Sequence, residues 1–140
     1  MHKVLHVGPD SCSVVSSLLE EGDTEAWGIE PYELDDVGAK CKNLVRKGIV
    51  RVADIKFSLP YRAKSFSLVI VSDALDYLSP RYLNKTLPEL VRVSADGVVI
   101  FTGTFPHEAS VLLVQTFAHL NLVKNLIYLK HLLGHIYLAA

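Results

Sequence analysis

The stretch Val52–Leu78, VADIKFSLPYRAKSFSLVIVSDALDYL, decides the fold. It ends one apolar run, passes through a polar loop and enters a second run, Phe66–Val71, in which nearly every residue is apolar. Strands that are buried on both faces have this composition, and they occur in parallel sheets that helices cover on both sides. The stretch therefore predicts an α/β protein, with this loop joining its third and fourth strands.

Each of these two apolar runs is followed by a carboxylate, Asp54 after the first and Asp73 after the second. The carboxyl ends of the strands form the ligand crevice of an open α/β sheet, so both acids are candidates for a binding site. Aspartate is also a preferred N-cap residue, and either acid could instead cap the turn or helix that follows it. The sequence leaves both interpretations open.

The rest of the chain alternates strand-like and helix-like segments. A first helix is expected after an N-cap at Ser11, a second over Asp35–Lys47, and a third from Ser79-Pro80, where Pro88 should kink or shorten it. This alternation predicts a parallel, doubly wound sheet with right-handed crossovers. The predicted strands are Lys3–Val7, Ala26–Ile29, Ile49–Val52, Ser67–Ser72 and Gly97–Phe101.

Composition fits one globular domain of 140 residues, half of them hydrophobic and 21% charged. The net charge of −1 argues neither for nor against a polyanionic partner, and nucleic acid is not among the expected partners. The longest uncharged stretch, Ala109–Val123, is shorter than the ~20 apolar residues of a transmembrane helix, so no membrane span is expected.

The cysteines and histidines give no clear site. Cys12 and Cys41 form no CxxC pair, so neither a disulfide framework nor a zinc site can be argued from them, and Cys12 is expected to be a small buried residue. His131 and His135 lie four apart but lack the glutamate and third ligand of a zinc protease. No metal is predicted.

The turn after the first strand has a single glycine, Gly8, because Pro9 and Asp10 occupy positions where dinucleotide-binding proteins have further glycines. This argues against a pyrophosphate cradle and a nicotinamide oxidoreductase. Glu30 ends the second strand, where an acid commonly accepts hydrogen bonds from ribose hydroxyls. A nucleoside ligand without a diphosphate, S-adenosylmethionine, best fits the four residues that follow successive strands: Gly8, Glu30, Asp54 and Asp73.

Several segments carry a family resemblance. The pattern Asp54, Leu59-Pro60, Ser65-Phe66, Leu68-Val69, Leu75 and Leu78 resembles the class I methyltransferase core. More narrowly, the chain resembles the plant Golgi homogalacturonan (pectin) methyltransferases of the cotton-Golgi-related family over about residues 5–100. The segments that carry this resemblance are HVGPDSCSVV, AWGIEPYEL, VRVADIKFSLPYR and SFSLVIVSDALDYLSPRYLNKTLPELVRVSADGVV.

The resemblance implies a Rossmann-like sheet of order 3-2-1-4-5 and a Golgi enzyme that methyl-esterifies galacturonate carboxylates of pectin with S-adenosylmethionine. It implies that the Gly8 turn faces the methionine part of the cofactor and that Glu30 binds the ribose. Asp54 with Ile55 would receive the adenine amino group, and Asp73 would lie near the sulfonium. The expected cofactor-binding residues are thus Gly8, Pro9, Asp10, Glu30, Asp54, Ile55 and Asp73.

A carboxylate acceptor is already a nucleophile at neutral pH, because such acids lose their proton near pH ~4. No catalytic base is therefore assigned, and cations are expected instead. Arg62 and Arg81 are the candidates to bind the acceptor, since guanidinium can grip a carboxylate with two hydrogen bonds. Tyr77, which stands where many relatives have His, joins them. An ordinary solvated basic face is the alternative.

Residues 1–105 are expected to form the methyltransferase core, and 106–140 an apolar helical tail packed on it. The family normally has a membrane anchor before the first strand, so the chain is interpreted as truncated. The alternative function is therefore an inactive interaction module with the methyltransferase fold. A tail that projected instead would drive self-association. The expected buried stripe of the tail is Leu113, Phe117, Leu120, Leu126, Ile127 and Leu133.

Overall fold

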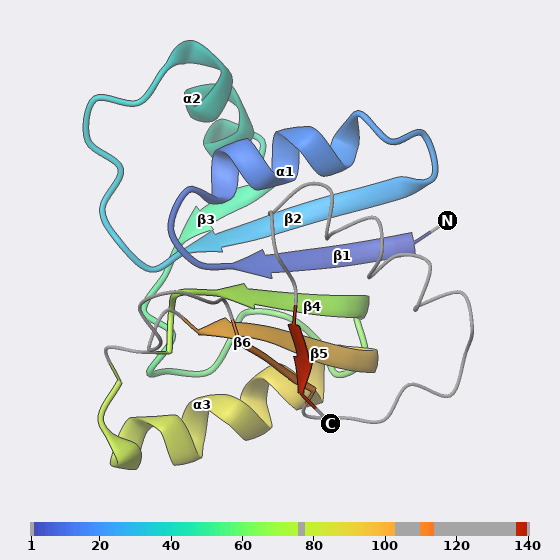
Figure 1. Cartoon of the computed structure of the whole chain (residues 1–140). Coiled ribbons are helices and arrows are strands. Elements are labelled where there is room, and N and C mark those ends of the chain that lie inside the picture. Colours follow the sequence, from blue (N-terminus) through green and yellow to red (C-terminus); the bar gives the residue numbers. More distant parts are fainter. Residues whose placement is uncertain (1, 76–77, 103–109, 114–136, 140) are drawn as a thin grey trace.

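A computed structural model describes residues 2–75, 78–102, 110–113 and 137–139, of which residues 101 and beyond are described by their backbone. It contains one seven-stranded sheet of order β3-β2-β1-β4-β5-β6-β7 (Figure 1). The first five strands in this order are parallel, which confirms the predicted order 3-2-1-4-5. The elements are β1 (His2–Val7), α1 (Ser11–Leu19), β2 (Thr24–Glu30), α2 (Ala39–Arg46), β3 (Val50–Val52), β4 (Phe66–Ser72), α3 (Pro80–Val93), β5 (Ser94–Thr102), β6 (Ser110–Leu113) and β7 (Tyr137–Ala139).

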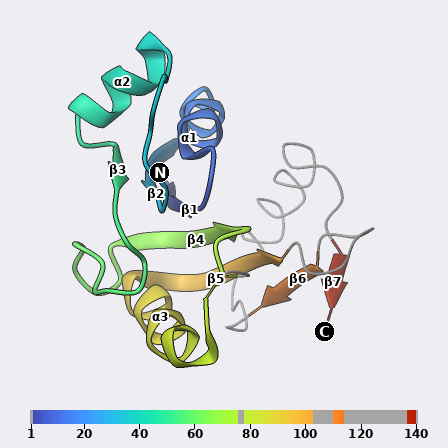
Figure 2. The ribbon, with the colours of Figure 1, turned by 90° about the vertical axis from the view of Figure 1, so that its left-hand side faces the viewer.

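The sheet separates two apolar cores, because successive side chains of a strand point to opposite faces. Along β4, Leu68 and Ile70 belong to the core beneath α1 and α2, whereas Val69 and Val71 belong to the core beneath α3. Figures 1 and 2 show α1 and α2 on one side of the sheet and α3 on the other. Burial on both faces thus explains why the deciding stretch is almost wholly apolar.

Helix boundaries depart from the sequence expectation in two places. Asp10 rather than Ser11 is the N-cap of α1. The second helix begins at Ala39 rather than Asp35, because Asp36 has a backbone φ of 52° and interrupts any earlier turn.

Pro88 lies inside the 14 residues of α3 without ending the helix. Both Pro88 and Asn84, whose carbonyl loses its helical partner, are on the exposed side of α3, where water can replace the lost bond.

The expected helix is wrong for the described part of the tail, which forms strands. β6 pairs antiparallel with β5, with Leu113 opposite Val99, and β7 pairs parallel with β6. An unpaired strand edge leaves backbone N–H and C=O groups without partners, so pairing at the edge of β5 competes with helix formation. The remaining residues of the expected stripe, Phe117, Leu120, Leu126, Ile127 and Leu133, lie outside the described residues, as do His131 and His135.

A disulfide joins Cys12 in the first turn of α1 to Cys41 in α2, with their Cα atoms 5.3 Å apart. Cys12, expected as a small buried residue, is instead partly buried and cross-linked. The sequence separation of 29 residues carries no disulfide signal, and the pair forms because α1 and α2 lie on the same face of the sheet. Since Leu44 is the buried residue of α2, the cross-link is a main attachment of this helix.

Among the helices that the structure describes, none has the length and apolar character of a transmembrane segment.

Reduction of this disulfide is expected to lower the free energy of unfolding by about 3–4 kcal/mol, because the unfolded chain loses a cross-link that closes a loop of about 30 residues. Urea unfolding with and without dithiothreitol measures the difference. The double variant Cys12→Ala/Cys41→Ala serves as the control, since its unfolding midpoint should not respond to the reductant. Equal midpoints for the oxidised and reduced native chain would contradict the cross-link.

Candidate cofactor site

Four predicted site residues lie at one edge of the sheet. Gly8 follows β1, Glu30 ends β2, Asp54 follows β3 and Asp73 follows β4. These strands are parallel neighbours, so their carboxyl ends meet at the same edge. A backbone hydrogen bond connects the turn after β1 to the end of β2, since Gly8 N–H donates to the Ile29 carbonyl at 3.0 Å. The structure thus brings together the residues that the sequence placed after successive strands.

The turn after β1 runs directly against the end of β4. A Cβ atom on Gly8 would lie 2.1 Å from the carbonyl oxygen of Ser72, and Gly8 has a φ of +153°. Both observations exclude a side chain at this position. The close approach brings the Gly8 turn against the end of β4, next to the residue that precedes Asp73. A single glycine is sufficient here because one contact, with Ser72, requires it.

A buried histidine lies beneath this turn. His6 is fully inaccessible, and its Nδ1 lies 2.7 Å from Ser11 Oγ and its Nε2 3.2 Å from Ser72 Oγ. Ser11 Oγ–H donates its single proton to a backbone carbonyl, either the Gly8 carbonyl at 2.9 Å or the Ile29 carbonyl at 3.1 Å. Ser11 Oγ therefore accepts from His6 Nδ1–H, and Nε2 accepts from Ser72 Oγ–H. The imidazole is neutral and connects the Gly8 turn to β4.

Burial also determines the charge state of this histidine. Desolvation lowers the pKa of His6 from its ordinary value of 6.5 to about 4. Both ring nitrogens have hydroxyl partners that suit the neutral imidazole. Sequence reasoning did not single out His6, because a histidine inside an apolar strand carries no signal of its partners, which come from α1 and β4.

Glu30 is a buried carboxylate, 3% exposed, whose Oε2 accepts a hydrogen bond from Ser11 N–H at 3.2 Å. Burial raises the pKa of Glu30, and backbone hydrogen bonds from Ser11 and Tyr32 oppose that rise. Ser11 is the first residue of α1, so the carboxylate meets the positive end of the helix. The acid that the sequence placed at the end of β2 therefore also fixes the start of α1.

Asp10 and Asp73 both adopt left-handed backbone conformations, with φ of 62° and 51°. Aspartate tolerates this region better than most residues, although it remains less favourable than ordinary backbone. Both side chains are exposed, and Asp10 Oδ1 accepts a bond from Ser13 Oγ at 3.1 Å. Two exposed acids in strained turns thus flank the contact between Gly8 and Ser72, which is the arrangement expected of ligand-facing residues.

Asp54 and Ile55 form the turn after β3. Asp54 Oδ1 accepts from Lys56 N–H at 3.0 Å, so the acid caps its own turn while its side chain stays exposed. Ile55 is buried, and its carbonyl accepts from Thr86 Oγ1 of α3 at 2.8 Å. The two interpretations of Asp54 are therefore compatible, since capping leaves it at the ligand edge.

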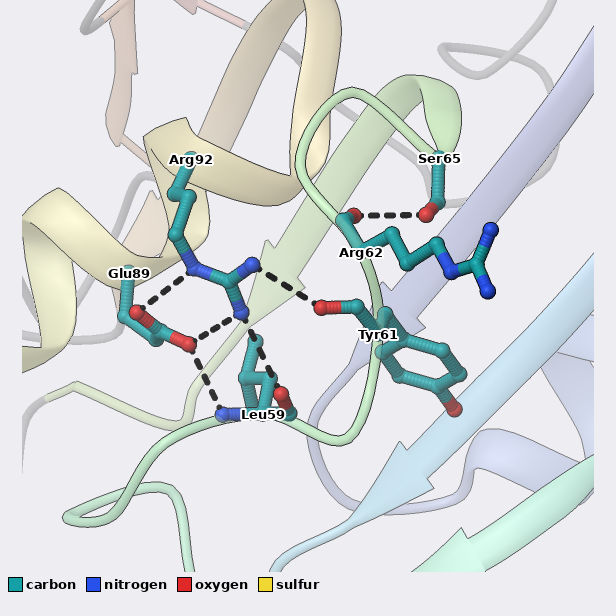
Figure 3. Close-up of polar contacts among 6 residues, drawn as sticks. All are labelled: Leu59, Tyr61, Arg62, Ser65, Glu89 and Arg92. Carbon is teal, nitrogen blue, oxygen red and sulfur yellow. Dashed lines mark hydrogen bonds and ion pairs between the residues drawn. The ribbon is translucent and has the colours of Figure 1, made fainter.

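An ion pair on α3 supports the loop between β3 and β4 (Figure 3). Glu89 Oε1 accepts from Leu59 N–H at 2.9 Å, and the Arg92 guanidinium donates to the carbonyls of Tyr61 at 2.9 Å and Leu59 at 3.2 Å. The hydrogen bond from Arg92 holds the pKa of Glu89 below its usual range. The i,i+3 spacing of Glu89 and Arg92 was the available sequence signal for this pair.

The structure separates the two arginines proposed to bind the acceptor. Arg81 lies in the first turn of α3, beyond the carboxyl end of β4. Arg62 shortly precedes the start of β4, where Lys64 N–H donates to the Arg92 carbonyl near the far end of α3. β4 has seven residues, which spans about 20 Å, so Arg62 lies at the opposite edge of the sheet. Tyr77 lies outside the described residues.

This sheet order, with a glycine turn after β1 and an acid at the end of β2, is the Rossmann-like core of class I S-adenosylmethionine-dependent methyltransferases. Solved structures show the same fold. The PH0226 protein of Pyrococcus horikoshii matches with a TM-score of 0.56 and 24% identity, covering 72% of this chain and 49% of that protein. A methyltransferase from Methanosarcina mazei matches with a TM-score of 0.52 and 17% identity, covering 72% and 51%.

A structure of Haemonchus contortus phosphoethanolamine N-methyltransferase 1, with phosphoethanolamine and S-adenosylhomocysteine, matches with a TM-score of 0.52 and 21% identity. The match covers 73% of this chain and 22% of that one. No family model matches the sequence.

The sequence is similar to two Arabidopsis thaliana proteins, which confirms the predicted resemblance to the cotton-Golgi-related proteins. It is 76% identical over 103 residues to the probable pectin methylesterase CGR2 and 74% identical over 103 residues to the probable pectin methylesterase CGR3. Each match covers 74% of this chain. The chain spans 40% of the length of either relative.

The neutral state of His6 predicts a loss of stability in acid. A histidine with a lowered folded-state pKa contributes stability above its unfolded pKa, and that contribution is lost as the pH falls toward the folded value. Between pH 6.5 and about pH 4 the loss should be roughly 3 kcal/mol of unfolding free energy. Urea unfolding across this pH range measures it.

The variant His6→Gln is the control for this experiment, because glutamine keeps a polar side chain and does not titrate. Glu30, whose raised pKa acts in the opposite direction, is present in both proteins, so the difference between their pH slopes isolates His6. Parallel slopes for the native chain and the variant would show that His6 is not held neutral.

Proposed function

We propose that this chain binds S-adenosylmethionine at the carboxyl edge of β1–β4, as part of an enzyme that methyl-esterifies galacturonate carboxylates of pectin in the Golgi. The observation that carries the proposal is the juxtaposition of the Gly8 turn with Glu30, Asp54 and Asp73 at one edge of a methyltransferase-type sheet. The names of the two Arabidopsis relatives support pectin as the substrate.

The chemistry of the edge suits this ligand. S-adenosylmethionine has a sulfonium and an amino acid in place of a diphosphate, so it needs no run of glycines and gains from nearby carboxylates. Asp10 and Asp73 are exposed acids beside the Gly8 turn, where the methionine part would lie. Glu30 would accept from the ribose hydroxyls, and Asp54 with Ile55 would receive the adenine amino group. A phosphate-bearing dinucleotide would meet repulsion from Asp10.

The reaction needs positioning more than acid–base chemistry. Bound at this edge, the cofactor supplies an electrophilic methyl group on sulfur. A galacturonate carboxylate is ionised at neutral pH and needs no base to activate it. The residues of the chain would align the acceptor oxygen with the methyl carbon and exclude water, which are large contributions in a displacement of this kind.

The disulfide supports a location in the secretory pathway. Disulfides form and persist in oxidising compartments and are rare in the cytosol. The Cys12–Cys41 cross-link attaches α2 to the helix that begins at the candidate site, so its formation would matter for the site as well as for stability. A domain on the lumenal side of the Golgi would meet this requirement.

The names of the relatives favour a second candidate, since a methylesterase removes the methyl groups that a methyltransferase adds. The fold supports transfer, because the matching solved structures include methyltransferases, one of them with S-adenosylhomocysteine. Radiolabelled methyl transfer to unesterified pectin and methanol release from esterified pectin distinguish the two directions. A chain that binds the cofactor and catalyses neither would fit the third candidate, a non-enzymatic interaction module.

Substitution of Glu30 tests the cofactor site. Glu30→Gln keeps the shape of the side chain and an oxygen for the Ser11 N–H, but it removes the charge. Loss of a charge-assisted bond to ribose should cost about 1.5–3 kcal/mol, a factor of roughly 10 to 150 in the dissociation constant for S-adenosylmethionine. Isothermal titration calorimetry measures this value.

The matched control is Glu33→Gln, an exposed acid three residues further along that lies outside the site and should leave the affinity unchanged. Unchanged affinity in a folded Glu30→Gln variant would contradict the assigned role. Absence of any binding by the native chain would refute the cofactor proposal itself.

A further inference from the structure

Cations and aromatic rings gather on one side of the candidate site. Lys56 Nζ lies 5.1 Å from the centre of the Tyr82 ring, and Arg81 Cζ lies 6.0 Å from the centre of the same ring. Lys56 belongs to the loop after β3, whereas Arg81 and Tyr82 belong to the first turn of α3. Both segments lie at the carboxyl edge of the sheet. The fold thus builds one cluster from residues that are 25 positions apart in the sequence.

The two segments are fixed to each other by buried contacts. Thr86 Oγ1, on the turn of α3 that follows Tyr82, donates to the Ile55 carbonyl at 2.8 Å, and Thr86 is 2% exposed. Glu89 accepts from Leu59 N–H further along the same loop (Figure 3). The backbone positions of Lys56 and Tyr82 are therefore determined by packing. Their side chains do not need to order one another.

Phe57 extends the cluster with an exposed ring. It is 69% exposed, the largest value among the exposed large hydrophobic residues in the described part of the chain. It directly follows Lys56 and comes two residues after the buried Ile55. An exposed phenylalanine offers an apolar face to a ligand, and its neighbour in the loop, Lys56, contacts the Tyr82 ring. Two rings and two cations are then available at the same rim.

The charges of the cluster are incompletely neutralised. Lys56 Nζ lies 3.6 Å from Asp54 Oδ2, and both side chains are partly exposed, so water weakens this pair. Within the residues that the structure describes, Arg81 has no carboxylate at ion-pair distance. A guanidinium in this position can bind an incoming carboxylate with two hydrogen bonds.

We propose that Lys56, Phe57, Arg81 and Tyr82 form the surface that binds an acidic polysaccharide acceptor. The cations would bind uronate carboxylates, and the rings would pack against the apolar faces of the sugars. This inference rests on the proposed function and adds the residues that recognise the polymer. It replaces the pair of arginines expected from the sequence, because Arg62 lies at the opposite edge and cannot reach the same sugar units.

A solvated basic face is the competing explanation, and the chain offers a matched control for it. Arg62 and Arg81 are both exposed arginines on one chain, at opposite ends of β4. Unspecific attraction of a polyanion depends on total charge, so loss of either arginine would weaken it equally. A specific surface at the carboxyl edge depends on Arg81 alone.

The experiment titrates the full, oxidised chain with an unesterified oligogalacturonate and, separately, with its fully methyl-esterified counterpart, using microscale thermophoresis. We expect the unesterified oligomer to bind more tightly. Arg81→Ala and Lys56→Ala should each weaken its binding by about threefold to fivefold, within the range of exposed ion pairs. Arg62→Ala should leave it unchanged. Tyr82→Phe should bind like the native chain, and Tyr82→Leu should bind less tightly.

Two outcomes would overturn the proposal: equal weakening by Arg62→Ala and Arg81→Ala, or equal affinity for the esterified and unesterified oligomers. Circular dichroism of each variant establishes that it is folded, and calorimetric titration with S-adenosylmethionine separates this inference from the proposed function. A native chain that binds the oligomer through Arg81 but binds no cofactor would refute the cofactor site and leave the acceptor surface standing. A chain that binds the cofactor normally, but whose affinity for the oligomer does not depend on Lys56, Arg81 or Tyr82, would refute the acceptor surface and leave the cofactor site standing.

Discussion

The contact between the Gly8 turn and the end of β4 is the constraint on which the candidate site depends. The turn lies so close to the Ser72 carbonyl that no side chain fits between them. His6 fixes this approach from below, with one ring nitrogen bonded to Ser11 and the other to Ser72. Because the turn then leads into α1, the same contact places the start of that helix against Glu30. Four elements of the fold therefore meet at one point.

The acids at this edge differ in a way that suits different parts of one ligand. Glu30 is buried and fixes backbone N–H groups of the turn, whereas Asp10, Asp54 and Asp73 are exposed. Two cations lie on the same rim, Lys56 on the loop after β3 and Arg81 on α3. A cationic cofactor near the acids and an anionic polymer near the cations would each meet complementary charge. Acids and cations that share one rim, with Lys56 Nζ 3.6 Å from Asp54 Oδ2, are thus the electrostatic basis of the proposed two-substrate site.

α3 determines the position of the loop that carries Asp54 and Lys56. Three of its residues, Thr86, Glu89 and Arg92, bond to backbone groups of this loop between Ile55 and Tyr61. Ile55 and Leu59 of the loop are also buried in the core beneath α3, so hydrogen bonds and apolar packing act together to hold it. The ligand edge of β3 is consequently only as well ordered as the packing of α3 against the sheet.

The sequence by itself determined the fold class and the residues that follow each strand. These features depend on local patterns: apolar strands of the right length, alternation with helices, and acids at strand ends. The strand order was implied by the resemblance of the sequence to class I methyltransferases. Only the tertiary structure decided which distant residues meet. The Cys12–Cys41 bond, the partners of His6 and the pairing of β6 with β5 all join segments whose spacing carries no periodic signal. Arg62 illustrates the reason most simply, because residues near each other in sequence lie at opposite edges of the sheet when a strand of about 20 Å runs between them.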